Sequence, residues 1–170
     1  MDTEKEKAAQ LLFVTHYEAM KKLAEGSPLV KNPDFELLTA LYVMADLAAL
    51  NSGKDRRALS DALTCQMALI LPDLDSDVLN ARVSLYGELL QGGKLRGDWF
   101  PGDPVLLGDD LFVRTVVLLG DILCNPDCGD DYAQAPGPGI PVADMMTFTV
   151  NVMTPLMHEL ADLFVGINQL

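Results

Sequence analysis

The chain has 170 residues, 49% of them apolar and 22% charged, a balance typical of globular proteins and unlike that of disordered chains. This length favours one domain, and we predict a single domain over residues 1–170. The formal charge of −13 is concentrated after residue 57, where four Lys and Arg stand against sixteen Asp and Glu, so direct binding to nucleic acid or to an anionic membrane is disfavoured.

The first half of the chain contains three predicted helices. Residues 3–25 form the first, because apolar side chains recur there at helical spacing until Gly26-Ser27-Pro28 ends the pattern. The second follows the start signal Asn32-Pro33-Asp34 and ends at Asn51-Ser52-Gly53. Its polar stripe is so thin that we expect a central helix, covered on most sides. The third covers about residues 54–71 and ends at a proline.

A fourth helix is predicted from Asp75 or Ser76 to Gln91, and a pair of glycines ends it. A long irregular loop follows at about residues 92–108, since Gly, Pro and Asp are too frequent there for a regular element. Residues 109–123 form a fifth helix, which is apolar nearly all round and is therefore expected to be the most buried.

A second long irregular loop covers about residues 125–141, and the last predicted helix covers about residues 142–168. Pro155 must kink or divide this helix, because proline lacks an amide hydrogen, and Thr154 and Pro155 together can start a new helix. No stretch alternates apolar and polar residues as a strand would. We therefore predict an all-α, single-domain bundle of five to seven helices, built as successive antiparallel helix hairpins with two long irregular loops.

Three cysteines, Cys65, Cys124 and Cys128, are too sparse and odd in number for the disulfide framework of a small secreted protein. The N-terminus is charged where a signal peptide requires an apolar run, and no uncharged apolar stretch reaches the roughly eighteen residues of a membrane helix. We therefore expect a cytoplasmic protein that does not enter a membrane. The sequence leaves open whether Cys124 and Cys128 are ever paired.

Asp73, Asp75 and Asp77 have the alternate spacing that opens a calcium-binding loop, but Val78 and Ser84 occupy the positions where that loop needs glycine and glutamate. The preferred interpretation is a helix cap. No phosphate-binding, zinc-binding or nucleophile motif occurs. We therefore predict no metal and no cofactor, and the familiar enzyme classes are disfavoured.

The two histidines differ in their surroundings. His16 lies on the apolar stripe of the first helix, where a histidine is more often a hydrogen-bonded core or interface residue than a base. His158 shares a polar row with Asn151 and Asp162, and Asp162, four residues on, can orient its imidazole. Our alternative hypothesis is therefore an enzyme or small-ligand-binding protein with a pocket between helices that uses Asn151, His158 and Asp162; a solvated helix face is the simpler interpretation.

The two predicted loops carry the other candidate residues. Trp99, the only tryptophan, and Phe100 are large aromatic side chains of the kind that anchor protein interfaces or fold back over a core. Carboxylates beside them and in the second loop can attract a basic partner, or can simply aid solubility. The candidate partner-binding residues are Asp98, Trp99, Phe100, Asp103, Asp127, Asp130 and Asp131.

These features predict an acidic protein-interaction module: an adaptor, a client-specific chaperone, or an inhibitor of a basic and possibly nucleic-acid-binding protein. The expected partner is another protein with a basic surface, and assembly into a homo-oligomer stays open. The hypothesis depends on the two acidic loops meeting at one end of the bundle.

Overall fold

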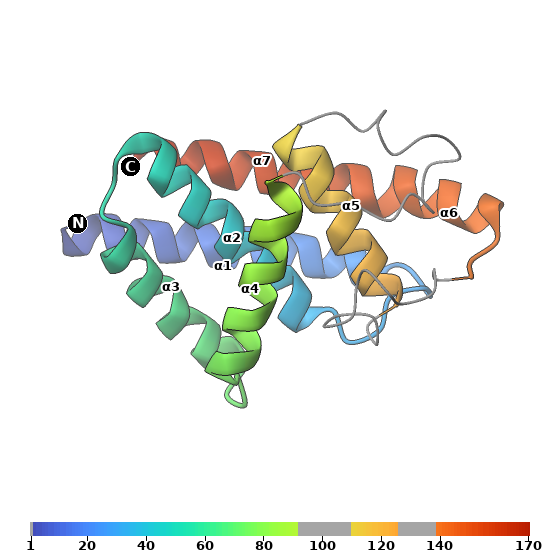
Figure 1. The fold of residues 1–170 in the computed structure, drawn as a ribbon, viewed down its shortest axis with the longest axis horizontal. Coiled ribbons are helices and arrows are strands. Elements are labelled where there is room, and N and C mark those ends of the chain that lie inside the picture. Colours follow the sequence, from blue (N-terminus) through green and yellow to red (C-terminus); the bar gives the residue numbers. More distant parts are fainter. Residues whose placement is uncertain (1, 92–109, 126–138) are drawn as a thin grey trace.

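The structure, a computed structural model, describes residues 2–91, 110–125 and 139–170 (Figure 1). Every regular element in these ranges is helical, and none is a strand, so the predicted all-α fold class is confirmed. Seven α-helices and one short π-helical segment make up the described residues. Their bounds are α1 Thr3–Glu25, α2 Asp34–Ser52, α3 Arg56–Ile70, α4 Ser76–Leu90, α5 Leu111–Cys124, α6 Val142–Phe148, η4 Thr149–Met153 and α7 Thr154–Gln169.

Aspartate side chains start four of these helices. Each accepts a hydrogen bond from a first-turn backbone N–H, which has no partner within the helix itself. Asp75 caps α4 in this way, because its Oδ1 accepts from the backbone N–H groups of Asp77 at 2.8 Å and Val78 at 3.2 Å. The preferred interpretation of this acidic run as a helix cap is confirmed. The four capping residues are Asp2, Asp55, Asp75 and Asp110.

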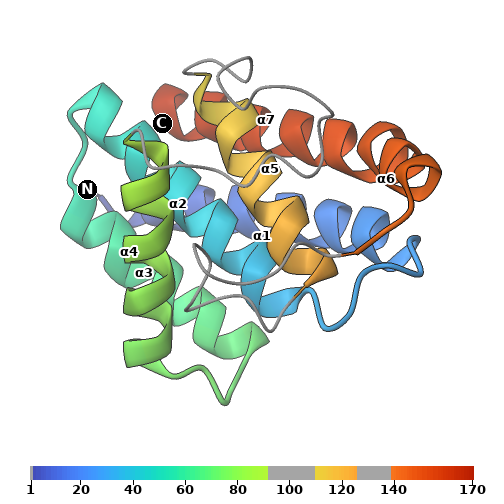
Figure 2. The same ribbon diagram turned by 45° about the vertical axis from the view of Figure 1, so that its right-hand side comes forward.

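Helix α2 lies at the centre of the fold, as its thin polar stripe predicts. It packs against α1, α3, α4, α5 and α7 (Figure 2). By length and composition alone α2 could also cross a membrane, but most of its apolar surface is buried among these helices. The predicted burial of α5 is confirmed too, since every residue from Thr115 to Leu123 is buried.

The packing partners differ from a plain series of hairpins. Helix α1 does pack against its neighbour α2, but α7 lies antiparallel beside α1 and also packs along α2 (Figures 1 and 2). Helices α3 and α4 diverge from their connection, and α4 packs instead against α2 and α5. The expected hairpin arrangement is thus corrected for α3 and α4, because an almost wholly apolar central helix needs cover from every side.

The last helix is interrupted where Pro155 predicts it. The N–H of Thr154 bonds to the carbonyl oxygen of Thr149, five residues back, which widens the turn into the π-helical segment η4. Pro155 then occupies the first turn of α7. Backbone N–H groups in a first turn have no acceptor within their own helix, so the lack of an N–H in proline costs α7 no hydrogen bond. The wider turn lies close to α5. A Cβ added to Gly120 of α5 would stand only 3.0 Å from the sulfur of Met153 in this turn.

Candidate functional site

The loop residues that the sequence predicts as a partner-binding surface lie outside the described residues. This holds for all seven of them, and the hypothesis that they gather at one end of the bundle stays a prediction. Cys128 also lies outside, so its pairing with Cys124 stays open. The residues concerned are Asp98, Trp99, Phe100, Asp103, Asp127, Asp130 and Asp131.

The residues of the alternative hypothesis do not form a hydrogen-bonded cluster in the described part of the chain. Asn151, His158 and Asp162 are all exposed, and no hydrogen bond between His158 and Asp162 is present among the described residues. His16 makes the contact that the sequence does not reveal, since its Nδ1 lies 2.6 Å from the Oε2 of Glu159. This pair joins α1 to α7, which agrees with the interpretation of His16 as an interface residue.

Two hollows in the described surface are candidates for function. The first lies between the start of α2 and the connection from α3 to α4, and has a volume of about 350 Å³. We call it the acidic groove. Its lining residues are Phe35, Leu71, Pro72, Asp73, Leu74, Asp75 and Val78.

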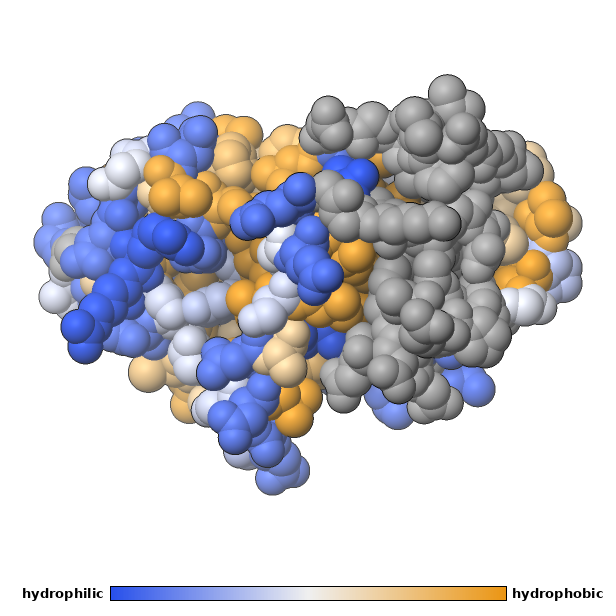
Figure 3. All heavy atoms as spheres, in the orientation of Figure 1, coloured by the Kyte–Doolittle hydropathy of each residue, from blue (hydrophilic) through white to orange (hydrophobic). Residues whose placement is uncertain are grey.

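The acidic groove places apolar side chains directly beside carboxylates. Leu71 and Leu74 are half-buried against the hydrophobic core, whereas Val78 is 48% exposed. Asp73 and Asp75 are exposed at the rim. In the space-filling view the connection between α3 and α4 forms the lower projection, where hydrophilic and hydrophobic residues lie side by side (Figure 3).

A buried ion pair supports the wall of this groove. Arg82 of α4 forms a salt bridge with Glu36 of α2, and both side chains are only 9% exposed. The guanidinium of Arg82 also lies 5.6 Å from the centre of the Phe35 ring. Because the positive charge of Arg82 is matched by Glu36, it does not neutralise the carboxylates at the rim.

The short connection that carries the rim is held by local bonds. The N–H of Leu74 donates to the carbonyl oxygen of Leu71 at 3.1 Å, and Asp75 caps the helix that follows. Among the described residues, no salt bridge involves Asp73, Asp75 or Asp77. These three carboxylates therefore give the groove a negative potential within a Debye length of about 8–10 Å.

The sequence indicates the acidic part of this groove but not its apolar part. The spacing of Asp73, Asp75 and Asp77 stands out, but as a cap or a failed calcium loop. Phe35 and Val78 carry no motif, and they come from segments that only the tertiary structure places side by side. Proximity of this kind has no local sequence signature.

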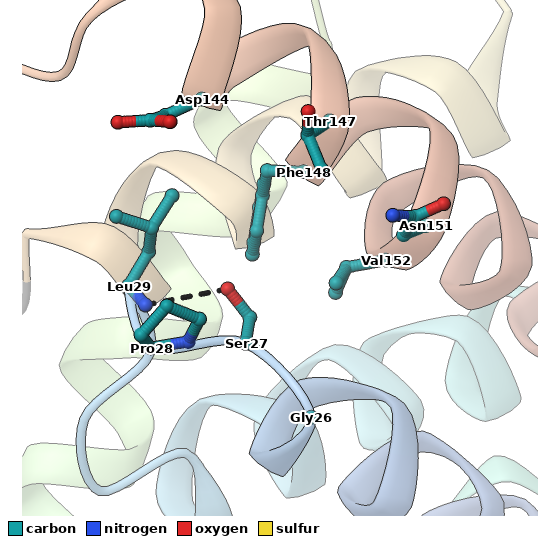
Figure 4. A pocket seen from close by; sticks show the side chains of 9 residues that line it. All are labelled: Gly26, Ser27, Pro28, Leu29, Asp144, Thr147, Phe148, Asn151 and Val152. Carbon is teal, nitrogen blue, oxygen red and sulfur yellow. Dashed lines mark hydrogen bonds between the residues drawn. The ribbon is translucent and has the colours of Figure 1, made fainter.

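The second hollow lies between the α1–α2 connection and the α6–η4 segment (Figure 4). We call it the α6 pocket, and its volume is about 210 Å³. Asn151, one of the three residues of the alternative hypothesis, lines it, whereas His158 and Asp162 do not. The lining residues are Gly26, Ser27, Pro28, Leu29, Asp144, Thr147, Phe148, Asn151 and Val152.

Cys124 has the chemistry of a packing residue. Burial, together with the negative charge of Asp121, raises the pKa of its thiol to about 12. A thiol with such a pKa is almost entirely protonated near neutral pH and is a poor nucleophile and metal ligand. The structure thus gives this cysteine no reactive character.

Comparison of the chain with known protein families, curated proteins and solved structures finds no match.

Proposed function

We propose that this chain is an acidic protein-interaction module that binds a basic, amphipathic segment of a partner protein in the acidic groove. Such a module would serve as an adaptor, as a client-specific chaperone, or as an inhibitor of a basic and possibly nucleic-acid-binding protein. The cytoplasm is the compartment that the cysteine content favours.

The observation that carries the proposal is the composition of the acidic groove. Its floor offers Phe35, Leu71 and Leu74 to an apolar anchor, and its rim offers Asp73 and Asp75 to cations. Its described lining contains no Lys, Arg or His. A peptide that presents Leu or Phe on one face and Lys or Arg beside them is complementary in both respects.

The charge of the whole chain favours the same class of partner. Four Lys and Arg against sixteen Asp and Glu after residue 57 give a surface that attracts basic proteins and repels phosphate backbones. The candidate loop residues Trp99, Asp127 and Asp130 would add contacts if they lie near the groove. The proposal does not require them, since it rests on the described residues that line the groove.

The direct test is a labelled model peptide with a leucine face and a lysine face, titrated with the full chain and followed by fluorescence anisotropy. We expect saturable binding that weakens about ten-fold when salt rises from physiological concentration to about 0.5 M. Asp73→Lys should weaken binding about five-fold or more, because an attractive charge becomes a repulsive one.

The matched control is Asp61→Lys, which makes the same charge change at an exposed position of α3 that does not line the groove. It should leave the affinity within about two-fold of the wild type. A second control peptide carries glutamate in place of lysine and should not bind. Equal losses for Asp73→Lys and Asp61→Lys would show diffuse attraction to an acidic surface, and they would contradict a specific groove, as would an absence of binding.

The alternative of a catalytic or ligand site built on His158 and Asp162 has less support. Both side chains are exposed, and neither lines the α6 pocket. Asn151 does line that pocket, but its neighbours there include Asp144 and Thr147 and not His158 or Asp162.

A further inference from the structure

The α6 pocket has two unlike walls. One is the connection from Gly26 to Leu29, where the N–H of Leu29 donates to the Oγ of Ser27 at 3.3 Å (Figure 4). The other is the α6–η4 segment, which contributes two rows of side chains spaced four residues apart. Thr147 and Asn151 form a polar row, and Phe148 and Val152 form an apolar row.

The apolar row makes the pocket a place for a hydrocarbon group. Phe148 and Val152 are buried, at 2% and 4% exposure, and their sides that face the pocket form its floor between Leu29 and the polar row (Figure 4). A volume of about 210 Å³ is smaller than the roughly 300 Å³ at which drug-sized ligand sites begin. The pocket therefore suits a ligand of about one ring and a short substituent.

The charge of the pocket selects the sign of the ligand. Among the described residues that line the pocket, Asp144 alone is ionisable, and its carboxylate lies on the rim above Leu29 (Figure 4). Gly26 is the residue that caps the C-terminal end of α1, a helix of 23 residues. The partial negative charge at a helix C-terminus adds to that of the carboxylate, so both favour a cation.

We infer that the α6 pocket binds a small organic cation, an ammonium group attached to a compact apolar body. The ammonium group lies at Asp144 and donates hydrogen bonds to its carboxylate, while the apolar body lies on Phe148 and Val152. Asn151 and Ser27 supply further polar contacts at the edge. This site is separate from the acidic groove, and it stands whether or not the proposed protein partner exists.

The test compares three probes of nearly equal size, benzylamine, benzyl alcohol and benzoate, which differ in charge. Each is titrated into the full-length, ¹⁵N-labelled wild-type chain, and amide chemical shifts are recorded. Benzylamine should shift the amides of 26–29 and 144–152 saturably. Benzyl alcohol and benzoate should bind about ten-fold more weakly or not at all.

Two variants separate recognition at Asp144 from general attraction to an acidic protein. Asp144→Asn should weaken benzylamine binding about ten-fold and leave benzyl alcohol unaffected. Asp162→Asn removes the same charge from an exposed position of α7 outside the pocket and should leave benzylamine binding unchanged. Both substitutions are at exposed positions. The comparison of the three probes on the wild-type chain remains a test of the inference even if a variant fails to fold.

Three results would overturn the inference. The first is benzyl alcohol binding as tightly as benzylamine, which would show an apolar hollow without charge selection. The second is an equal loss of benzylamine affinity in Asp144→Asn and Asp162→Asn. The third is the absence of saturable shifts at 26–29 and 144–152.

Discussion

Tyr17 links the middle of α1 to the start of α2 through a single carboxylate. Its hydroxyl donates to the Oδ1 of Asp34 at 2.5 Å, and the Nζ of Lys21 lies 3.1 Å from the same oxygen. Burial and the hydrogen bond to Asp34 raise the pKa of the Tyr17 phenol to about 12. The neutral phenol is therefore the form that the folded chain stabilises.

The contribution of Tyr17 to stability follows from the sign of this shift. It is fully present below the ordinary phenol pKa near 10, and it is lost as the pH rises from about 10 to 12, because the unfolded chain then releases the proton more readily. Subtracting the tyrosinate absorbance titration of Tyr17→Phe from that of the wild type should give a midpoint near 12. Asp34→Asn should move this midpoint toward 10; a wild-type midpoint near 10 would contradict the assignment.

At the scale of elements, two glycines in helix interiors experience opposite environments. An ideal Cβ on Gly87 of α4 would meet no atom of the described residues within 4 Å, whereas a Cβ on Gly120 of α5 would lie 3.0 to 3.2 Å from the side chain of Met153. Met153 belongs to η4 and is buried, so it has little room to move aside. The contact shows how closely α5 approaches the π-helical turn.

The same substitution should therefore have different effects in the two helices. Gly87→Ala should raise the free energy of unfolding by about 0.5–1 kcal/mol, because alanine restricts the unfolded chain and favours the helix. Gly120→Ala has the same favourable effect on the backbone, but its new methyl group must displace Met153. The free energy of unfolding of Gly120→Ala should therefore be lower than that of Gly87→Ala by about 1 kcal/mol or more. Urea unfolding measures both. Equal stabilisation of the two variants would show that α5 and η4 are less tightly packed than described.

At the scale of the molecule, the two ends of the chain share one hydrophobic core. Leu156, Leu160 and Leu163 of α7 are fully buried in the same cluster as Phe13 of α1 and Leu41 of α2. Both termini lie at the same end of the bundle (Figure 1). The first two helices are therefore only partly covered until the last one is in place.

Removal of residues 142–170 should abolish cooperative unfolding of the remaining chain. The truncation would expose the faces of α1 and α2 that α7 covers, and α7 is the described helix that packs most extensively against each of them. Thermal unfolding followed by circular dichroism should lose its sigmoidal shape, and a dye that binds exposed apolar surface should fluoresce. Adding a peptide of residues 139–170 should restore the transition. A truncated chain that unfolds as sharply as the full one would contradict this account.

The sequence by itself determined the helices and their limits. Aspartate caps, the glycine that ends α2 and the break before Pro155 act within a turn or two, so they can be interpreted without knowing the fold. The thin polar stripe of α2 also predicted its central place, because an apolar helix must be covered on all sides.

Only the tertiary structure decided which helices meet and which residues share a hollow. The pairing of α7 with α1, the Arg82–Glu36 salt bridge and the neighbourhood of Phe35 and Val78 join residues that lie far apart in the chain. Each helix presents several faces that satisfy the same apolar pattern, so periodicity states that a face is buried but not against what. The partner of each face is chosen by how all the helices pack together, and the acidic groove and the α6 pocket are consequences of that choice.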